Sequence, residues 1–188
     1  MVERRNSIIV MVGLPACGKS TLSLVIAEQM AVLNRNVKII DLDVIFSHLT
    51  NPNKQSIDGL WQQARLLALE HTTEALKACD VDVIVDDNNE YRSMRKPYFR
   101  LAQMRGYGYV ELHFKNFTYN QSLIRDSYRQ NPVGPDAITN ITKRIEWTDV
   151  TESNVWILVV DEFQAIFDYL QKSIKVPDPL PTQESIVK

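Results

Sequence analysis

A glycine-rich segment near the N-terminus has the residue types and spacing that bind phosphate groups. The sequence GLPACGKST, residues 13–21, matches the pattern G-x-x-x-x-G-K-[S/T]. Glycines allow backbone N–H groups to turn toward an anion, and the N-terminus of a following helix adds partial positive charge. In this pattern the lysine reaches the β- and γ-phosphates of ATP, and the serine hydroxyl binds Mg²⁺. We predict that the phosphate cradle consists of Gly13, Leu14, Pro15, Ala16, Cys17, Gly18, Lys19, Ser20 and Thr21.

Carboxylates follow two predicted strands. Asp86 and Asp87 end the apolar run 81–85, and Asp43 lies just beyond the shorter run 37–40. Because ligands bind outside the carboxyl ends of parallel strands, these side chains should face the same crevice as the phosphate cradle. We expect Asp86 or Asp87 to hold Mg²⁺, and Asp43 to accept the proton of an attacking hydroxyl group. The alternatives are that Asp43 caps the next helix and that the paired aspartates only cap a turn.

Arginines further along the chain could neutralise the charge that develops during phosphoryl transfer. Arg125 and Arg129 are four residues apart and share one helix face, just before the loop NPVGP. We predict that they form a mobile lid, and a solvated basic face is the alternative. Arg95, in the stretch DDNNEYRSMR, is expected to face the acceptor substrate or its phosphates. A basic patch that could contact RNA phosphates is formed by Arg95 with Arg92, Lys96, Arg100 and Arg105.

The elements that must position these side chains alternate between strand and helix. Such an order is typical of a parallel sheet, and we therefore predict an α/β P-loop kinase fold with a mostly parallel five-stranded sheet and helices on both faces. Ser93 is expected to cap a helix that Gly106 ends, with Pro97 in its first turn, and His71 to lie on the buried face of an earlier helix. The predicted strands are 7–12, 37–40, 81–85, 109–114 and 155–160, and the other predicted helices are 20–33, 57–78, 120–129, 135–145 and 162–172.

The composition fits one domain. Of 188 residues, 45% are hydrophobic and 23% charged, so we expect a P-loop kinase domain at 1–175 and a disordered, proline-rich tail at 176–188. The net charge of −2 gives no global basic field for nucleic acid. The sequence contains two cysteines, and it shows neither a secretory signal nor an apolar run long enough to span a membrane. We therefore expect a cytoplasmic protein without a membrane partner.

Several segments, taken in order, resemble the L-seryl-tRNA(Sec) kinase family. These are GLPACGKST, the aspartate after the second predicted strand, VDDNNEYRSMR, IRDSYR and IEWTD with NVW, and they span roughly Ile8 to Asp161. The resemblance implies ATP- and Mg²⁺-dependent phosphorylation of the serine hydroxyl of seryl-tRNA(Sec), a step toward selenocysteinyl-tRNA. It also implies the roles of Lys19 and Ser20 at the phosphates and metal, Asp43 as base, Asp86 or Asp87 near Mg²⁺, and Arg125 and Arg129 as the lid pair.

The sequence departs from this family in three places. Asp126 replaces the lid asparagine, and Phe46 stands where archaeal members have an arginine. The family usually continues into a helical region that grips the tRNA, whereas little sequence follows the fifth predicted strand here. A homodimer or a partner subunit could supply those contacts. Two alternatives stay open: an ATP-binding factor like the Elongator-associated tRNA-modification ATPases, and a P-loop kinase of a small metabolite or polynucleotide end.

Overall fold

The computed structural model describes residues 6–49, 56–148 and 156–159. The predicted helix 162–172 and the predicted tail 176–188 lie outside these residues, as does the predicted domain boundary at residue 175.

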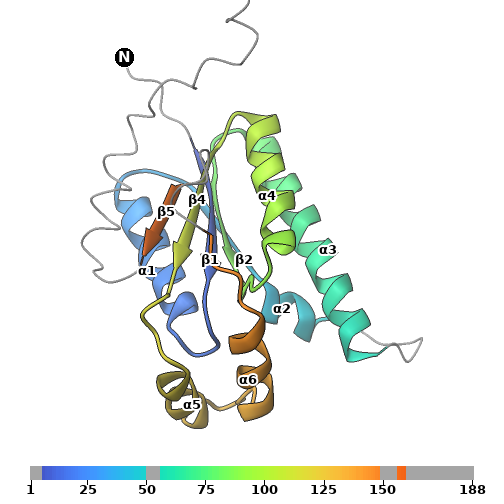
Figure 1. Cartoon of the computed structure of the whole chain (residues 1–188). Helices are drawn as coiled ribbons and strands as arrows, with labels where there is room; N and C mark the ends of the chain where they lie inside the picture. Colours follow the sequence, from blue (N-terminus) through green and yellow to red (C-terminus); the bar gives the residue numbers. More distant parts are fainter. Residues whose placement is uncertain (1–5, 50–55, 149–155, 160–188) are drawn as a thin grey trace, which may run out of the picture.

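A parallel sheet forms the centre of the molecule (Figure 1). Its strands lie in the order β2-β3-β1-β4-β5, and every neighbouring pair is parallel. The central strands β1 and β3 are almost entirely buried, which explains their continuous apolar runs. The predicted α/β fold with a parallel sheet is therefore confirmed. The strands are β1 Ser7–Val12, β2 Val37–Asp41, β3 Asp82–Asp86, β4 Gly108–His113 and, at the edge, β5 Trp156–Val159.

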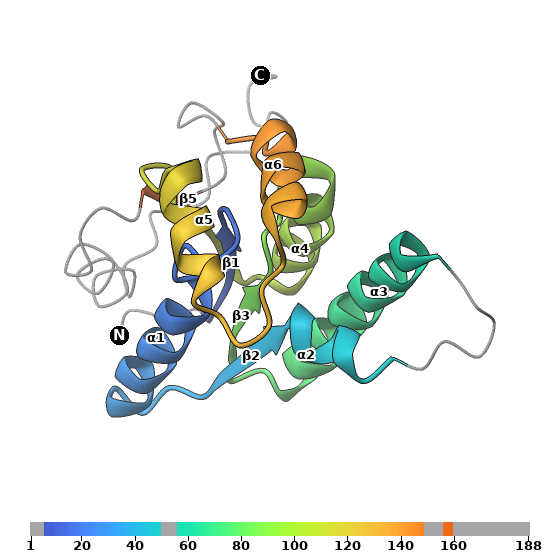
Figure 2. The same cartoon turned by 90° about the horizontal axis from the view of Figure 1, so that it is seen from below.

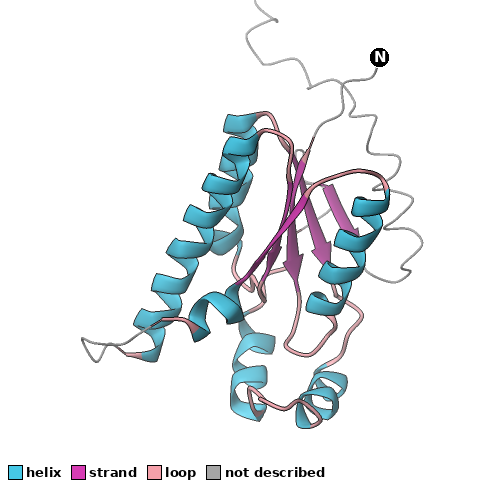
Figure 3. Cartoon of the chain, turned by 180° about the vertical axis from the view of Figure 1, so that it is seen from behind, coloured by secondary structure: helices cyan, strands magenta, loops and turns pink. Residues whose placement is uncertain are grey.

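Helices cover both faces of the sheet, as the alternating pattern predicted (Figure 3). On one face lies α1 (Lys19–Val32), and on the other lie α3 (Ile57–Ala75) and α4 (Arg92–Arg105). A short 3₁₀ turn, Leu76–Ala78, continues α3. Three shorter helices gather at the end toward which the strands point, and Figure 2 views the molecule from that end. They are α2 (Leu42–Ser47), α5 (Tyr119–Ser127) and α6 (Pro135–Arg144).

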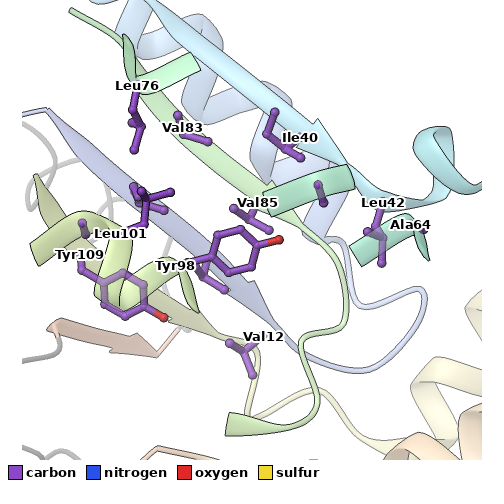
Figure 4. Close-up of a cluster of buried hydrophobic side chains, with 14 residues drawn as sticks. Val12, Ile40, Leu42, Ala64, Leu76, Val83, Val85, Tyr98, Leu101 and Tyr109 are labelled. Carbon is purple, nitrogen blue, oxygen red and sulfur yellow. The ribbon is translucent and has the colours of Figure 1, made fainter. Parts of the chain in front are cut away.

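Side chains of β3 alternate between the two faces of the sheet, as the pleat of any strand requires. Val83 and Val85 join Tyr98 in the core beneath α3 and α4 (Figure 4), whereas Ile84 joins the core beneath α1. The same alternation continues at the end of the strand. This alternation directs Asp86 to the α1 side of the sheet and Asp87 to the side of α3 and α4.

Three local predictions about helices are wrong, and one is confirmed. Helix α4 starts two residues earlier than a cap at Ser93 would give, with Tyr91 at its N-cap and no side-chain cap, so Ser93 lies inside the helix. Pro97 is consequently in the helix interior, where it removes a backbone hydrogen bond. Gly106 ends the helix with a left-handed φ of 70°, as predicted. His71 is exposed, because the buried face of α3 is formed by Ala64, Ala68 and Thr72.

Candidate functional site

Strand β1 delivers the glycine-rich segment to the end of the sheet where α1 begins. Gly18 is the N-cap of α1 with φ of 101°, a conformation that favours glycine. Gly13 is tightly enclosed, since a Cβ atom there would lie 2.8 Å from Cβ of Phe114 and 2.9 Å from Sγ of Cys17. The first turn of α1 contains no acidic residue. The loop and the helix N-terminus therefore have the conformation that the predicted anion cradle requires.

Lys19 is buried inside this cradle. Its Nζ donates to the carbonyl oxygens of Gly13 (3.3 Å) and Leu14 (2.8 Å) and to Oδ1 of Asn88 (2.8 Å). The ammonium group is thus held at the phosphate position by oxygens that a bound anion could replace. The contact between Lys19 and Asn88 was not predicted, although the position of Asn88 directly after the paired aspartates could have indicated that it lies near the cradle.

Asp86 lies beside Ser20 at the mouth of the cradle. Burial raises the pKa of the Asp86 carboxyl, while a hydrogen bond from the Ser20 hydroxyl and the charge of Lys19 oppose that rise. A hydroxyl and a carboxylate are oxygen donors that suit Mg²⁺, which usually keeps water and phosphate oxygens as its other ligands. In the described ranges no group of three or more His, Cys, Asp and Glu could hold a metal. The residues therefore fit a Mg²⁺ that arrives with a nucleotide.

Asp87 points to the opposite side of the sheet and lines a pocket between α3 and α4. Its Oδ1 accepts a hydrogen bond from the backbone N–H of Asn88 (2.7 Å). Burial raises the pKa of Asp87 to about 6, with Glu90 adding to the rise and Arg65 opposing it. We therefore correct the prediction of a metal role for Asp87, because the strand pleat turns it away from the cradle.

Asp43 is exposed and lies in the first turn of α2. It is not the helix cap, since Asp41 holds that position and accepts a hydrogen bond from the backbone N–H of Val44 (3.1 Å). Nη2 of Arg129 lies 4.0 Å from Oδ2 of Asp43. The structure therefore brings the predicted base together with one of the two predicted lid arginines.

Helix α5 carries Arg125 and is attached directly to the cradle, but it ends at Ser127, so Arg129 lies beyond it and does not share a helix face with Arg125 as predicted. The buried Ser122 hydroxyl donates to the carbonyl oxygen of Pro15 (2.6 Å). Arg125 is exposed, and its guanidinium lies 4.7 Å from the ring centre of Phe117. The structure therefore places only Arg129 beside the carboxylate of α2.

Asp126, the departure from the resembled family, lies in the last turn of α5 and has a structural role next to the loop that leads to α6. Its buried carboxylate accepts hydrogen bonds from the backbone N–H groups of Val133 (3.2 Å) and Gly134 (2.9 Å). Nη1 of Arg129 lies 3.6 Å from the same carboxylate. Asp126 thus orders the loop and orients the lid arginine.

Arg95 is only 2% exposed and faces no substrate site. It donates to the carbonyl oxygens of Asn89 (2.7 Å) and Glu146 (2.7 Å) and to the hydroxyl of Thr148 (3.1 Å), and its Nε lies 3.4 Å from Oε1 of Glu111. The predicted substrate role for Arg95 is wrong, because these protein groups enclose its guanidinium. Arg95 instead attaches the segment after α6 to the end of β3.

Glu111 and His113 complete this buried network and were missed in the sequence. Oε2 of Glu111 accepts from Nε2 of His113 (2.8 Å) and from the Thr148 hydroxyl (2.7 Å). Burial opposes ionisation of Glu111, but these hydrogen bonds outweigh it and lower the pKa. The available signal was a pair of polar residues inside the otherwise apolar run YVELHF.

The parallel sheet, the glycine-rich cradle and the carboxylate beside Ser20 together define an α/β protein of the P-loop kinase type. The chain belongs to the family described as chromatin associated protein KTI12, whose model matches residues 7–186. It is also similar to the L-seryl-tRNA(Sec) kinase of Methanococcus maripaludis, with 25% identity over 197 residues that cover 96% of this chain and 75% of that protein.

Solved structures show the same fold. Kti12 of Chaetomium thermophilum in complex with ADP-AlF3 has a TM-score of 0.62 and 20% identity, and the match covers 90% of this chain and 100% of that one. The APS kinase CysC of Mycobacterium tuberculosis in complex with AMPPNP and APS has a TM-score of 0.59 and 15% identity, with 90% and 99% covered. Both of those structures carry a nucleotide or a nucleotide analogue on this fold. Within the described ranges, no helix is both long and apolar enough to cross a membrane.

Proposed function

We propose that this protein transfers the γ-phosphoryl group of ATP to a hydroxyl group, and that the acceptor is the serine of seryl-tRNA(Sec). The observation that carries the proposal is the approach of Arg129 to Asp43, 4.0 Å apart at the cradle end of the sheet. A carboxylate that accepts a proton and a guanidinium that neutralises phosphoryl charge are the two groups this transfer needs. The similarity to the Methanococcus maripaludis kinase supports the seryl-tRNA acceptor.

Each residue of the site then has a defined task. The backbone N–H groups of the glycine-rich loop, other than Pro15, which has none, bind the β- and γ-phosphates together with Lys19, and Ser20 with Asp86 would hold Mg²⁺. When bound, Mg²⁺ would neutralise part of the negative charge on the phosphate oxygens. Asp43 orients the serine hydroxyl and accepts its proton as the oxygen attacks the γ-phosphorus, and ADP leaves as the bond between the γ-phosphorus and the β–γ bridging oxygen breaks. Arg129 stabilises the charge on the transferred group, and we assign Arg125 to the same lid in its closed form.

The test is a product assay with radiolabelled ATP. We expect labelled O-phosphoserine after mild hydrolysis of seryl-tRNA(Sec), and none from free serine or deacylated tRNA. Asp43→Asn should remove transfer and leave ATP binding unchanged. Asp58→Asn, which changes an exposed carboxylate in the first turn of α3, is the matched control and should keep full activity. Full transfer by Asp43→Asn would rule out its role as base.

A second candidate is RNA-stimulated ATP hydrolysis without a phosphorylated product. The family match and the exposure of the Asp43 side chain, 71%, favour it, because water could reach the base directly. Release of phosphate that depends on tRNA, with no labelled RNA or amino acid, would select this candidate over the first.

We also propose a cytoplasmic location and an RNA contact supplied by a homodimer or partner subunit. Cys17 and Cys79 are both free thiols in the structure, which fits a reducing compartment. Size-exclusion chromatography with light scattering, in the presence and absence of tRNA, tests the assembly.

A further inference from the structure

The turn that follows β3 contacts the phosphate cradle through Asn88. Oδ1 of Asn88 accepts a hydrogen bond from Nζ of Lys19 (2.8 Å), and its backbone carbonyl oxygen accepts one from the N–H of Gly13 (3.2 Å). Nζ of Lys19 also donates to the carbonyl oxygens of Gly13 and Leu14, which belong to the glycine-rich loop. The Lys19 ammonium group therefore lies between the loop on one side and Asn88 on the other.

The Asn88 side chain presents a hydrogen-bond donor next to this ammonium group. An amide has an acceptor atom, Oδ1, and a donor atom, Nδ2. Because an ammonium group only donates, its contact with Asn88 uses Oδ1, and Nδ2 belongs to the same amide group. Within residues 6–49, 56–148 and 156–159, no group accepts a hydrogen bond from Nδ2 of Asn88. Lys19 and Asn88 thus offer an anion two neighbouring donors.

Buried contacts of the next residue fix the backbone of this turn. Asn89 is 2% exposed and has a left-handed φ of 47°. Its Nδ2 donates to the carbonyl oxygen of Met11 in β1 (2.9 Å), and its carbonyl oxygen accepts a hydrogen bond from Nη1 of Arg95 (2.7 Å). The backbone that carries Asn88 is therefore anchored to β1 and to α4. A donor held in this way needs little rearrangement to act on a bound phosphate.

We propose that Asn88 binds the γ-phosphate of ATP, with Oδ1 positioning the Lys19 ammonium group and Nδ2 donating a hydrogen bond to a γ-phosphate oxygen. In such a cradle the loop N–H groups surround the α- and β-phosphates, and the lysine reaches the β- and γ-phosphates. A donor on the far side of the lysine from the loop therefore meets the γ-phosphate. The proposal rests on the part of the proposed function that places ATP in the cradle, and it makes Asn88 a residue that distinguishes ATP from ADP.

The experiment measures the affinities of AMPPNP and ADP, each with Mg²⁺, by titration calorimetry. Asn88→Leu keeps a side chain of similar size but removes its donor and its acceptor. We expect AMPPNP to bind about tenfold more weakly to this variant, in line with the loss of one hydrogen bond to a charged group, and ADP to change by less than about threefold. Asn36→Leu is the matched control, because Asn36 is exposed directly before β2, at the opposite end of the sheet, and it should change neither affinity.

A second variant, Asn88→Ala, protects the test if Asn88→Leu fails to fold, and it should show the same selective loss of AMPPNP affinity. Equal weakening of both nucleotides, unchanged AMPPNP affinity, or no binding of either nucleotide by the unchanged protein would overturn the proposal. Because binding is measured without an acceptor, a selective loss without phosphoserine product defeats only the proposed transfer. Phosphoserine product together with equal weakening of both nucleotides defeats only the role of Asn88.

Discussion

Replacing Arg95 by methionine separates two roles that this residue could have. The structure gives Arg95 a buried position with three hydrogen bonds and an ion pair to Glu111. Arg95→Met keeps much of the side-chain volume but leaves the Glu111 carboxylate and two backbone carbonyls without their charged partner. Breaking a buried pair in this way costs about 3–5 kcal/mol, a large share of the roughly 5–15 kcal/mol that stabilises a domain.

The assay is equilibrium unfolding in urea, with ATP-analogue binding measured on the same samples. Arg100→Met is the matched control, because Arg100 is exposed on the same helix and its loss should change stability by only about 0.5 kcal/mol. In the double variant with Glu111→Gln the two costs should not add, since the second change removes the charge that the first leaves unpaired. The reasoning is refuted if Arg95→Met is as stable as Arg100→Met yet loses phosphoryl transfer, which is the behaviour of a substrate-binding arginine.

Three further predictions concern the cradle, the lid and the buried network. Gly13→Ala should weaken binding of an ATP analogue by about tenfold, since its Cβ would lie 2.8 Å from Cβ of Phe114; unchanged affinity in a titration would contradict the enclosed geometry. Asp126→Ala should lower the free energy of unfolding by about 2 kcal/mol, because two partly buried backbone N–H groups lose their carboxylate partner, and an unchanged urea midpoint would count against it. Burial lowers the pKa of His113, so that below about pH 6.5 this side chain is protonated in the unfolded chain but stays neutral in the folded one. The stability of the fold therefore decreases as the pH drops through about 6.5. His113→Gln should make the decline of the melting temperature between about pH 7.5 and about pH 5.5 shallower, whereas His71→Gln, at an exposed position, should keep the original slope.

Much of the fold could be predicted because its signals are local. The central strands β1 and β3 contain uninterrupted apolar runs, and Gly106 ends α4 by a conformation that a single residue determines. The spacing of the cradle likewise depends only on neighbouring residues of one loop and one helix turn. Errors in local structure were confined to positions where tertiary packing decided the helix, such as Ser93 and His71.

The candidate site was predicted in its parts but not in its arrangement. The sequence by itself determined the spacing that predicts a phosphate cradle with Lys19 and Ser20, and it determined that carboxylates follow the strands. Only the tertiary structure decided which aspartate faces the cradle, because the strand pleat separates Asp86 from Asp87 and the packing of α1 chooses the side.

The same distinction explains Arg95 and Arg129. From the sequence, both arginines looked equally able to bind a phosphate, because the residue type alone does not show which groups will surround the guanidinium in the folded protein. Arg95 is enclosed by groups from β4 and from the segment after α6, whereas Arg129 reaches Asp43 of α2 across the open end of the sheet. Contacts between residues distant in sequence form only when the chain has folded, and for this protein they decide which charges stabilise the fold and which remain free for chemistry.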